Sequence, residues 1–292
     1  MIIIIASLLQ FYVHCPTCSQ VPFFVAARQG DLAALQEIIT RSPGGINQTD
    51  KTGMTALHFA AYAAQHEAVR LLLQKGADPN LADYQGATPL HFAAEVGDLE
   101  SIRLLLNGGA AVDACDKGGA SPLAVAAEYN RLPAMTLLMD SGASLGLCSG
   151  GPPRLSPLHL AAKNGQVGSA RMLIDRGADV NLIAPDRQNT PLQAAMGVYN
   201  RKTDVVEYLL EHGANPNMKD IDGNTPLHWA CYELRPSFQI LLLAHGANPF
   251  ILNKKGLIPA GVSLVVLGKI AKQVPTNIKD EFNKLTLELF VP

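Results

Sequence analysis

The chain has 292 residues, of which 48% are hydrophobic and 16% charged, and its formal net charge is −2 at pH 7. This apolar fraction excludes an intrinsically disordered chain, and the near-zero charge without any basic run argues against nucleic-acid binding. The five cysteines are odd in number and scattered along the sequence. They therefore argue against a disulfide framework and fit a reducing compartment.

The N-terminus begins with an apolar stretch, and Arg28 is the first charged residue. The stretch is too short to span a bilayer, which takes about 20 apolar residues, so we expect no membrane span. It has the length of a signal-peptide core, but a basic start and a small-residue cleavage site are missing. We expect residues 1–20 to be an uncleaved apolar segment that covers the first layer of the fold. A cleaved export signal is the alternative.

Cys15 and Cys18 have the spacing of a metal-binding or redox pair. A zinc site would need a second pair at similar spacing, and a thioredoxin-like site would need a surrounding βαβ unit. The sequence contains neither, so we predict no metal site and no cofactor.

A short pattern recurs along the chain, in which Thr or Ser is followed in most copies by Pro-Leu and then by small and apolar residues. It begins at Thr55, Thr88, Ser121, Ser156, Thr190 and Thr225, with intervals of 33, 33, 35, 34 and 35 residues. A Leu-rich stretch that leads into Gly-Ala, followed in most copies by Asp or Asn, recurs in the same phase, at 71–80, 104–110, 173–181, 209–217 and 241–249. Two patterns in phase over five periods indicate a tandem repeat.

The period of about 33 residues and the Thr-Pro-Leu-His motif resemble the ankyrin repeat. The resemblance covers roughly residues 21–258 and implies an all-α repeat solenoid, in which each unit is a helix-turn-helix followed by a β-hairpin finger. We expect seven repeats within residues 21–256, the first of them divergent. The other repeats start near Met54, Ala87, Ala120, Leu155, Asn189 and Asn224.

The recurring residues also have local physical roles. The Thr or Ser hydroxyl can cap the first helix, and the following Pro fits its first turn. The Gly after the Leu-rich stretch, as at Gly76 and Gly177, suits a left-handed residue that ends the second helix. One such unit buries too little apolar surface to fold alone, so neighbouring repeats must stack.

Residues 257–292 depart from the repeat pattern. Ile278, Phe282, Leu285 and Leu289 share one helical face, so we predict a C-terminal helical cap. The alternative is a SOCS-box-like segment, because one large group of ankyrin proteins carries such a box after its last repeat. Its two contact motifs would begin at residues 263–264 and 274–275, although Gly268 and Asn277 differ from the box pattern. That reading implies elongin B and C as partners.

No enzyme is predicted. The sequence has no phosphate-binding loop, nucleophile elbow or kinase signature. His58, His91, His159 and His228 occupy one slot of the repeat, and the resemblance implies that they bridge neighbouring finger backbones by hydrogen bonds.

We expect a non-catalytic, intracellular scaffold or adaptor that is cytoplasmic or nuclear. The resemblance implies that a protein partner binds along the concave face formed by finger tips and first helices. The alternatives are the substrate-recognition subunit of a cullin-type ubiquitin ligase and a secreted effector. The candidate partner-binding residues are Tyr62, Tyr84, Gln85, Glu95, Lys117, Glu128, Tyr129, Lys163, Arg187, Gln188, Tyr232 and Lys254.

Asn181 is the candidate modification site. Ankyrin repeats in animal cells are often hydroxylated on the finger Asn by an iron-dependent asparaginyl hydroxylase. The preferred setting has Leu eight residues earlier and an acidic-Val pair just before, as Leu173 and Asp179-Val180 provide here. Asn80 and Asn217 follow Pro instead. The simpler interpretation is that Asn181 only supports its finger backbone.

Overall fold

A computed structural model of the chain describes residues 21–149, 154–197 and 203–259. The apolar segment 1–20, the residues 150–153 and 198–202, and the tail 260–292 lie outside these residues. The predictions for an N-terminal cover, a C-terminal cap and a SOCS-box-like segment therefore remain predictions.

In the described part of the chain, fourteen α-helices form seven consecutive pairs. The pairs in chain order are α2 Val21–Gln29 and α3 Leu32–Arg41; α4 Ala56–Tyr62 and α5 His66–Gln74; α6 Pro89–Val96 and α7 Leu99–Asn107; α8 Pro122–Glu128 and α9 Leu132–Asp140; α10 Pro157–Lys163 and α11 Val167–Asp175; α12 Pro191–Ala195 and α13 Asp204–Glu211; α14 Pro226–Tyr232 and α15 Pro236–Ala244. A short 3-10 helix, η2 Pro43–Gly45, follows α3.

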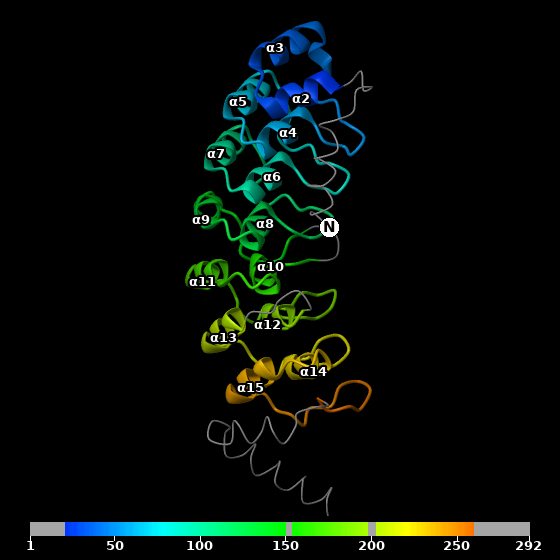
Figure 1. Cartoon of the computed structure of the whole chain (residues 1–292), viewed down its shortest axis with the longest axis vertical. Coiled ribbons are helices and arrows are strands. Elements are labelled where there is room, and N and C mark those ends of the chain that lie inside the picture. Colours follow the sequence, from blue (N-terminus) through cyan, green and yellow to red (C-terminus); the bar gives the residue numbers. More distant parts are fainter. Residues whose placement is uncertain (1–20, 150–153, 198–202, 260–292) are drawn as a thin grey trace, which may run out of the picture.

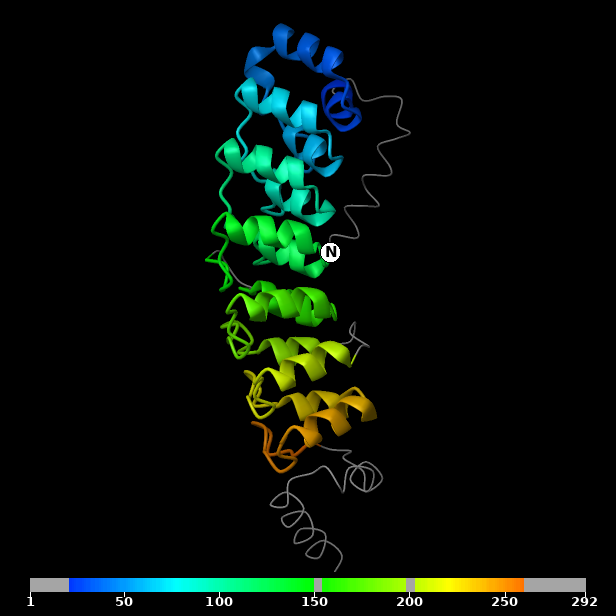
Figure 2. The same ribbon diagram turned by 90° about the vertical axis from the view of Figure 1, so that its left-hand side faces the viewer.

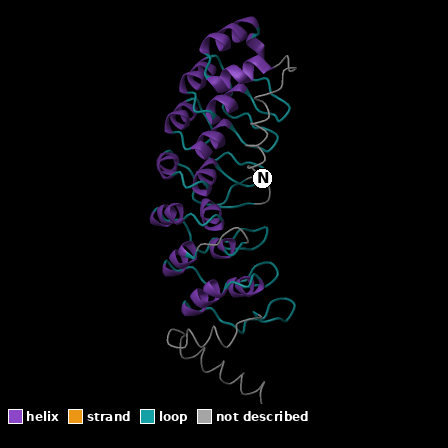
Figure 3. Ribbon diagram, in the orientation of Figure 1, coloured by secondary structure: helices purple, strands orange, loops and turns teal. Residues whose placement is uncertain are grey.

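The pairs stack into an elongated solenoid, which confirms the predicted fold class. The second helices form an outer column, the first helices an inner column, and the finger loops project beyond the inner column (Figure 1, Figure 2). Figure 3 shows helices and loops in the described ranges and no ribbon in the strand colour. The fingers contain isolated bridges, Thr49 with Thr55 and Ala184 with Asn189, instead of extended hairpin strands.

The predicted caps of the first helices are present. Thr88 begins α6, with its side chain bonded to the backbone of His91 and with Pro89 in the first turn. The same arrangement begins α10 at Ser156 and α14 at Thr225. The side chain of the third helical residue reaches back to the cap backbone, so each cap satisfies two helix-end groups.

The core lies between the two helical columns and runs without interruption from Phe23 to Ala247. Paired alanines of the first helices, such as Ala93 and Ala94, are fully buried and let neighbouring repeats approach closely. Leucines of the second helices fill the space between layers: Leu72, Leu105, Leu138 and Leu173 all have 0% exposure. Each repeat thus contributes one layer to a core that no repeat could form alone.

Candidate functional site

The repeated histidines are structural, as predicted. The backbone N–H of the capping residue donates to His Nδ1, so Nε2 carries the proton and donates to the last carbonyl of the finger. These Nε2–O distances are 3.1 Å from His58 to Ala87, 3.2 Å from His91 to Ala120, 3.1 Å from His159 to Asn189 and 3.0 Å from His228 to Leu257. Burial lowers the pKa of His58, His91 and His159 to about 4, so these side chains are neutral at pH 7.

The concave surface is defined here as the finger tips together with the C-terminal ends of the first helices. At its centre, the ends of α4, α6 and α8 bring together Tyr62, Glu95, Glu128 and Tyr129, all half-buried. The ring of Tyr62 packs edge-on against that of Phe92, with centroids 6.0 Å apart. The Tyr129 hydroxyl donates to the Glu95 carboxylate. We call these four residues the carboxylate–tyrosine cluster.

The two carboxylates of the cluster destabilise each other's charge. Burial raises the pKa of Glu95 to about 7, and the nearby charge of Glu128 adds to this effect, while Arg131 opposes it. Burial also raises the pKa of Glu128, against the opposing influence of Lys163. Both groups are thus ionised at neutral pH only at an energetic cost, which a nearby cation would lower.

Among the described residues, neither carboxylate has a counter-charge within ion-pair distance. Six ion pairs are found among the described residues, and none of them includes Glu95 or Glu128. From the described residues, the Glu128 carboxylate accepts one long hydrogen bond, 3.4 Å from the Asn164 amide. Arg131, although close, donates to the backbone carbonyl of Glu95, at 2.8 Å.

The finger-tip candidates form a second group. Tyr84 is 61% exposed, and Gln85, Lys117, Arg187 and Gln188 are exposed as well. Their backbones are tied from finger to finger, because Lys117 N–H donates to the Gln85 carbonyl at 2.7 Å and Ile221 N–H donates to the Arg187 carbonyl at 2.9 Å. These bonds keep the backbones of neighbouring finger tips in register, and the candidate side chains remain exposed.

Two further candidates lie at the C-terminal end of the described repeats. Tyr232, 79% exposed, and Lys254 line a cavity of about 530 Å³ beside Trp229. The Trp229 indole N–H donates to Asp220 at 2.8 Å. The sequence reasoning missed Trp229, although a single Trp in the slot of Phe59 and Phe92 was a visible signal. Lys163 is exposed at the end of α10, next to the carboxylate–tyrosine cluster.

Asn181 joins two repeats. Its amide donates to the Gly213 carbonyl at 2.9 Å, and its oxygen accepts from Asn215 N–H at 2.8 Å. Asn80 and Asn217 make the same pair of bonds to the repeats that follow them. The Asn181 side chain thus bonds the backbone of the next repeat, whereas its own turn is held by Asp179, whose side chain accepts from Asn181 N–H at 2.9 Å.

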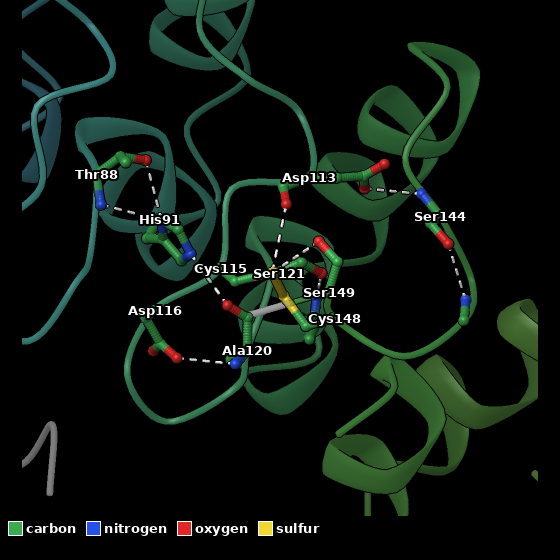
Figure 4. Close-up of a disulfide and its surroundings, with 12 residues drawn as sticks. Thr88, His91, Asp113, Cys115, Asp116, Ala120, Ser121, Ser144, Cys148 and Ser149 are labelled. Carbon is green, nitrogen blue, oxygen red and sulfur yellow. Dashed lines mark hydrogen bonds between the residues drawn. A yellow bond between two sulfur atoms is a disulfide. The ribbon is translucent and has the colours of Figure 1, made fainter. Parts of the chain in front are cut away.

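The expectation of no disulfide is wrong for one pair. Cys115 and Cys148 form a disulfide, with their Cα atoms 5.9 Å apart and a separation of 33 residues (Figure 4). That separation is one repeat period, so the two residues occupy equivalent positions of adjacent fingers. The five cysteines are scattered along the chain, but Cys115 and Cys148 share one phase of the repeat. Cys231 is a buried free thiol, and burial raises its pKa to about 11.

In the part of the chain that the structure describes, no three His, Cys, Asp or Glu side chains are grouped as metal ligands would be. Over the same residues, no helix has the length and apolar character to cross a bilayer.

Comparison with known proteins accounts for the repeat architecture. The family model "Ankyrin repeats (3 copies)" matches residues 23–116, 76–147, 97–184 and 158–253, which together cover most of the chain. The chain belongs to the ankyrin repeat family. The human ASB11 ankyrin repeat domain has a similar structure, with a TM-score of 0.63 and 26% identity, over 78% of this chain and 99% of that one.

Curated relatives match over shorter segments. Ankyrin repeat protein L92 of Acanthamoeba polyphaga mimivirus is 46% identical over 54 residues, which are 18% of this chain and 13% of that protein. The human NAD-capped RNA hydrolase NUDT12 is 41% identical over 59 residues, 20% of this chain and 13% of that protein. The matched segments are small parts of these relatives. The ankyrin fold indicates a protein-interaction domain, but the activity of a whole relative does not transfer to this chain with it.

Proposed function

We propose that this ankyrin protein is a non-catalytic scaffold or adaptor whose concave surface binds a protein partner, and that the partner inserts a Lys or Arg side chain between Glu95 and Glu128. The observation that carries the proposal is the carboxylate–tyrosine cluster, in which two half-buried carboxylates lie together without an ion-pair partner among the described residues.

Charge complementarity selects the partner's chemistry. A cation between the two carboxylates offsets their repulsion and part of the cost of their burial. Tyr62 and Tyr129 border the same place, and tyrosine rings add cation–π attraction to a nearby ammonium or guanidinium group. Tyrosine is also enriched among residues that dominate interface energetics. A phosphate-rich nucleic acid would be repelled by the same pair of carboxylates.

The exposed row of finger-tip side chains extends the contact area around this centre. Helix layers about 8–10 Å apart place seven repeats along a surface on the order of 60 Å long. That length accommodates an interface of about 1,600 Å², the usual size for a specific complex.

The test compares capture of partners by three forms of the full chain. Glu95→Gln/Glu128→Gln removes both charges with little change in volume, and Glu207→Gln/Glu211→Gln removes two exposed charges from α13 in the outer column. Mass spectrometry identifies the proteins that bind the unmodified chain and the α13 variant but not the cluster variant. The affinity of each of these proteins for the three forms is then measured by titration. We expect binding at least about tenfold weaker in the cluster variant. Equal affinity of all three forms would refute the proposed contact.

A cytoplasmic or nuclear location and the absence of catalysis are part of this proposal. The cullin-ligase alternative rests on residues 263–264 and 274–275, and it requires elongin B and C to co-purify with the full chain. Export is the second alternative, and the Cys115–Cys148 disulfide favours it, since disulfides persist mainly in oxidising compartments. Intact-mass measurement of the protein from its native host decides this point, because a cleaved chain would start beyond Cys18.

A further inference from the structure

In the described part of the fourth repeat's finger, residues 143–149 and 154–155, no side chain braces the backbone as in five other fingers. In five of the other six fingers, an Asp or Asn oxygen accepts hydrogen bonds from backbone N–H groups two or four residues later. The fifth finger has Ala184 at this position. The braces are Asp50, Asp83, Asp116, Asp220 and Asn253. The sequence from Cys148 to Leu155 is Cys-Ser-Gly-Gly-Pro-Pro-Arg-Leu, with no Asp or Asn.

The same finger also lacks the histidine bridge. In five first helices the third residue after the cap, a His or Gln193, donates to the last carbonyl of its finger. In α8 this slot holds Ala124, whose methyl group cannot donate. The carbonyl of Leu155 therefore receives no bond from that slot.

The disulfide lies where both supports are missing. It joins Cys148, in the unbraced finger, to Cys115, in the braced finger of the third repeat (Figure 4). The two fingers are otherwise connected by Ser144 N–H to Asp113 at 2.9 Å and by a long bond from Leu155 N–H to the Gly119 carbonyl at 3.4 Å. The covalent bond is thus the strongest link between this finger and its neighbour in the described residues.

We propose that the Cys115–Cys148 disulfide is a reversible redox site that holds the finger of the fourth repeat in place, and that a dithiol reductant opens it. Any consequence for partner binding rests on the proposed function. The redox step itself does not depend on any partner.

The chemistry is thiol–disulfide exchange. A thiolate of the reductant attacks Cys115 Sγ, because Cys115 is half-buried whereas Cys148 is only 7% exposed. A bond forms between the reductant's sulfur and Cys115 Sγ, the disulfide bond breaks, and its electron pair leaves on Cys148 Sγ, which takes up a proton. The second thiolate of the reductant then displaces Cys115 and becomes part of the reductant's own disulfide. Two electrons pass to the protein.

Two measurements on the full chain test the site. Free thiols are first blocked with an alkylating reagent at lysis. The protein is then reduced with dithiothreitol and labelled with a second reagent, and peptide mass spectrometry before and after this step shows which cysteines carry each label. Hydrogen exchange of the peptides that contain residues 143–149 and 154–160 is then compared in the oxidised and reduced protein. The Cys115→Ser/Cys148→Ser variant mimics the opened state, and Cys231→Ser, which changes a free thiol, is the matched control.

We expect Cys115 and Cys148 to be unblocked at lysis and to become labelled together after dithiothreitol. Reduction should increase exchange in the finger at least about threefold in the unmodified chain and in Cys231→Ser, and oxidised glutathione should restore the slow rate. In the Cys115→Ser/Cys148→Ser variant, hydrogen exchange in the finger should be fast both with and without dithiothreitol. Free thiols at lysis, or equal exchange in both redox states, would overturn the proposal. Hydrogen exchange needs no partner, so either result is independent of whether the concave surface binds one.

Discussion

Gln193 in the sixth repeat occupies the slot of His159 in the fifth repeat and makes the same two hydrogen bonds. Thr190 N–H donates to Gln193 Oε1 at 2.8 Å, and Gln193 Nε2 donates to the Asn224 carbonyl at 3.1 Å. For His159, Ser156 N–H donates to Nδ1 at 3.4 Å, and Nε2 donates to the Asn189 carbonyl at 3.1 Å. An amide thus replaces an imidazole in this slot without loss of the bridge, and an amide does not titrate.

The first prediction concerns the acid stability of His159→Gln. Burial lowers the pKa of His159 to about 4, below the ordinary 6.5, so the unfolded chain binds the proton more readily. This histidine's contribution to stability is therefore complete above pH 6.5 and is lost as the pH falls from 6.5 towards 4. Between pH 6.5 and pH 4, the free energy of unfolding of His159→Gln should therefore fall by about 3 kcal/mol less than that of the unmodified chain. Urea unfolding followed by circular dichroism at pH 7.5 and pH 4 measures the difference.

His159→Ala is the control for this comparison. It removes both bonds and should cost about 1–3 kcal/mol already at pH 7.5. Glu95 titrates in the opposite sense, since its pKa is raised to about 7, but it is present in every form and cancels. Identical pH dependence in His159→Gln and the unmodified chain would contradict the assigned protonation state.

The second prediction uses the brace of the second finger. Asp83 accepts from Gln85 N–H at 2.8 Å and from Ala87 N–H at 2.9 Å, and burial raises the pKa of its carboxyl. Asn253 makes the equivalent bonds in the last finger, both at 3.0 Å. Asp83→Asn should therefore unfold at pH 7 with a free energy equal to or slightly above that of the unmodified chain.

Asp83→Ala should instead cost about 1–3 kcal/mol, because two backbone donors lose their acceptor. Thermal unfolding of the three forms at pH 7 provides the measurement. A large loss in Asp83→Asn would show that the negative charge itself supports the finger.

The third prediction separates backbone strain from steric contact. Gly76 and Gly86 both have left-handed backbone angles, with φ of +89° and +83°. A Cβ at Gly76 has no neighbour within 4 Å, whereas a Cβ at Gly86 would lie 2.8 Å from the Lys117 backbone nitrogen. Gly76→Ala should cost about 1 kcal/mol through strain alone. Gly86→Ala should cost about 1–3 kcal/mol more, since the link between two fingers must shift. Denaturant titration compares the two, and equal losses would show that the fingers adjust freely.

The fourth prediction concerns modification of Asn181. Its hydrogen bonds are equivalent to those of Asn80 and Asn217, so the sequence around it must supply any selectivity. After co-expression with an asparaginyl hydroxylase, peptide mass spectrometry should find one added oxygen on Asn181 before any other Asn. Oxidation of Asn80 or Asn217 with Asn181 unmodified would contradict this order.

The repeat period by itself determined the solenoid. The contacts that define one repeat depend on residues within one period: the cap at Thr88, the first-turn Pro89 and the bridge made by His91. Stacking then brings the same contacts into register from repeat to repeat. Local pattern was sufficient here because each repeat touches only its neighbours.

Only the tertiary structure decided which surface residues act together. Tyr62, Glu95 and Glu128 come from three successive repeats, and their mutual influence depends on burial and separation across layers, which a periodic pattern does not encode. The disulfide shows the same limit. The 33-residue spacing of Cys115 and Cys148 was readable in the sequence, but bonding requires that adjacent fingers bring the two Cα atoms within 5.9 Å. That distance follows from how two repeats pack against each other.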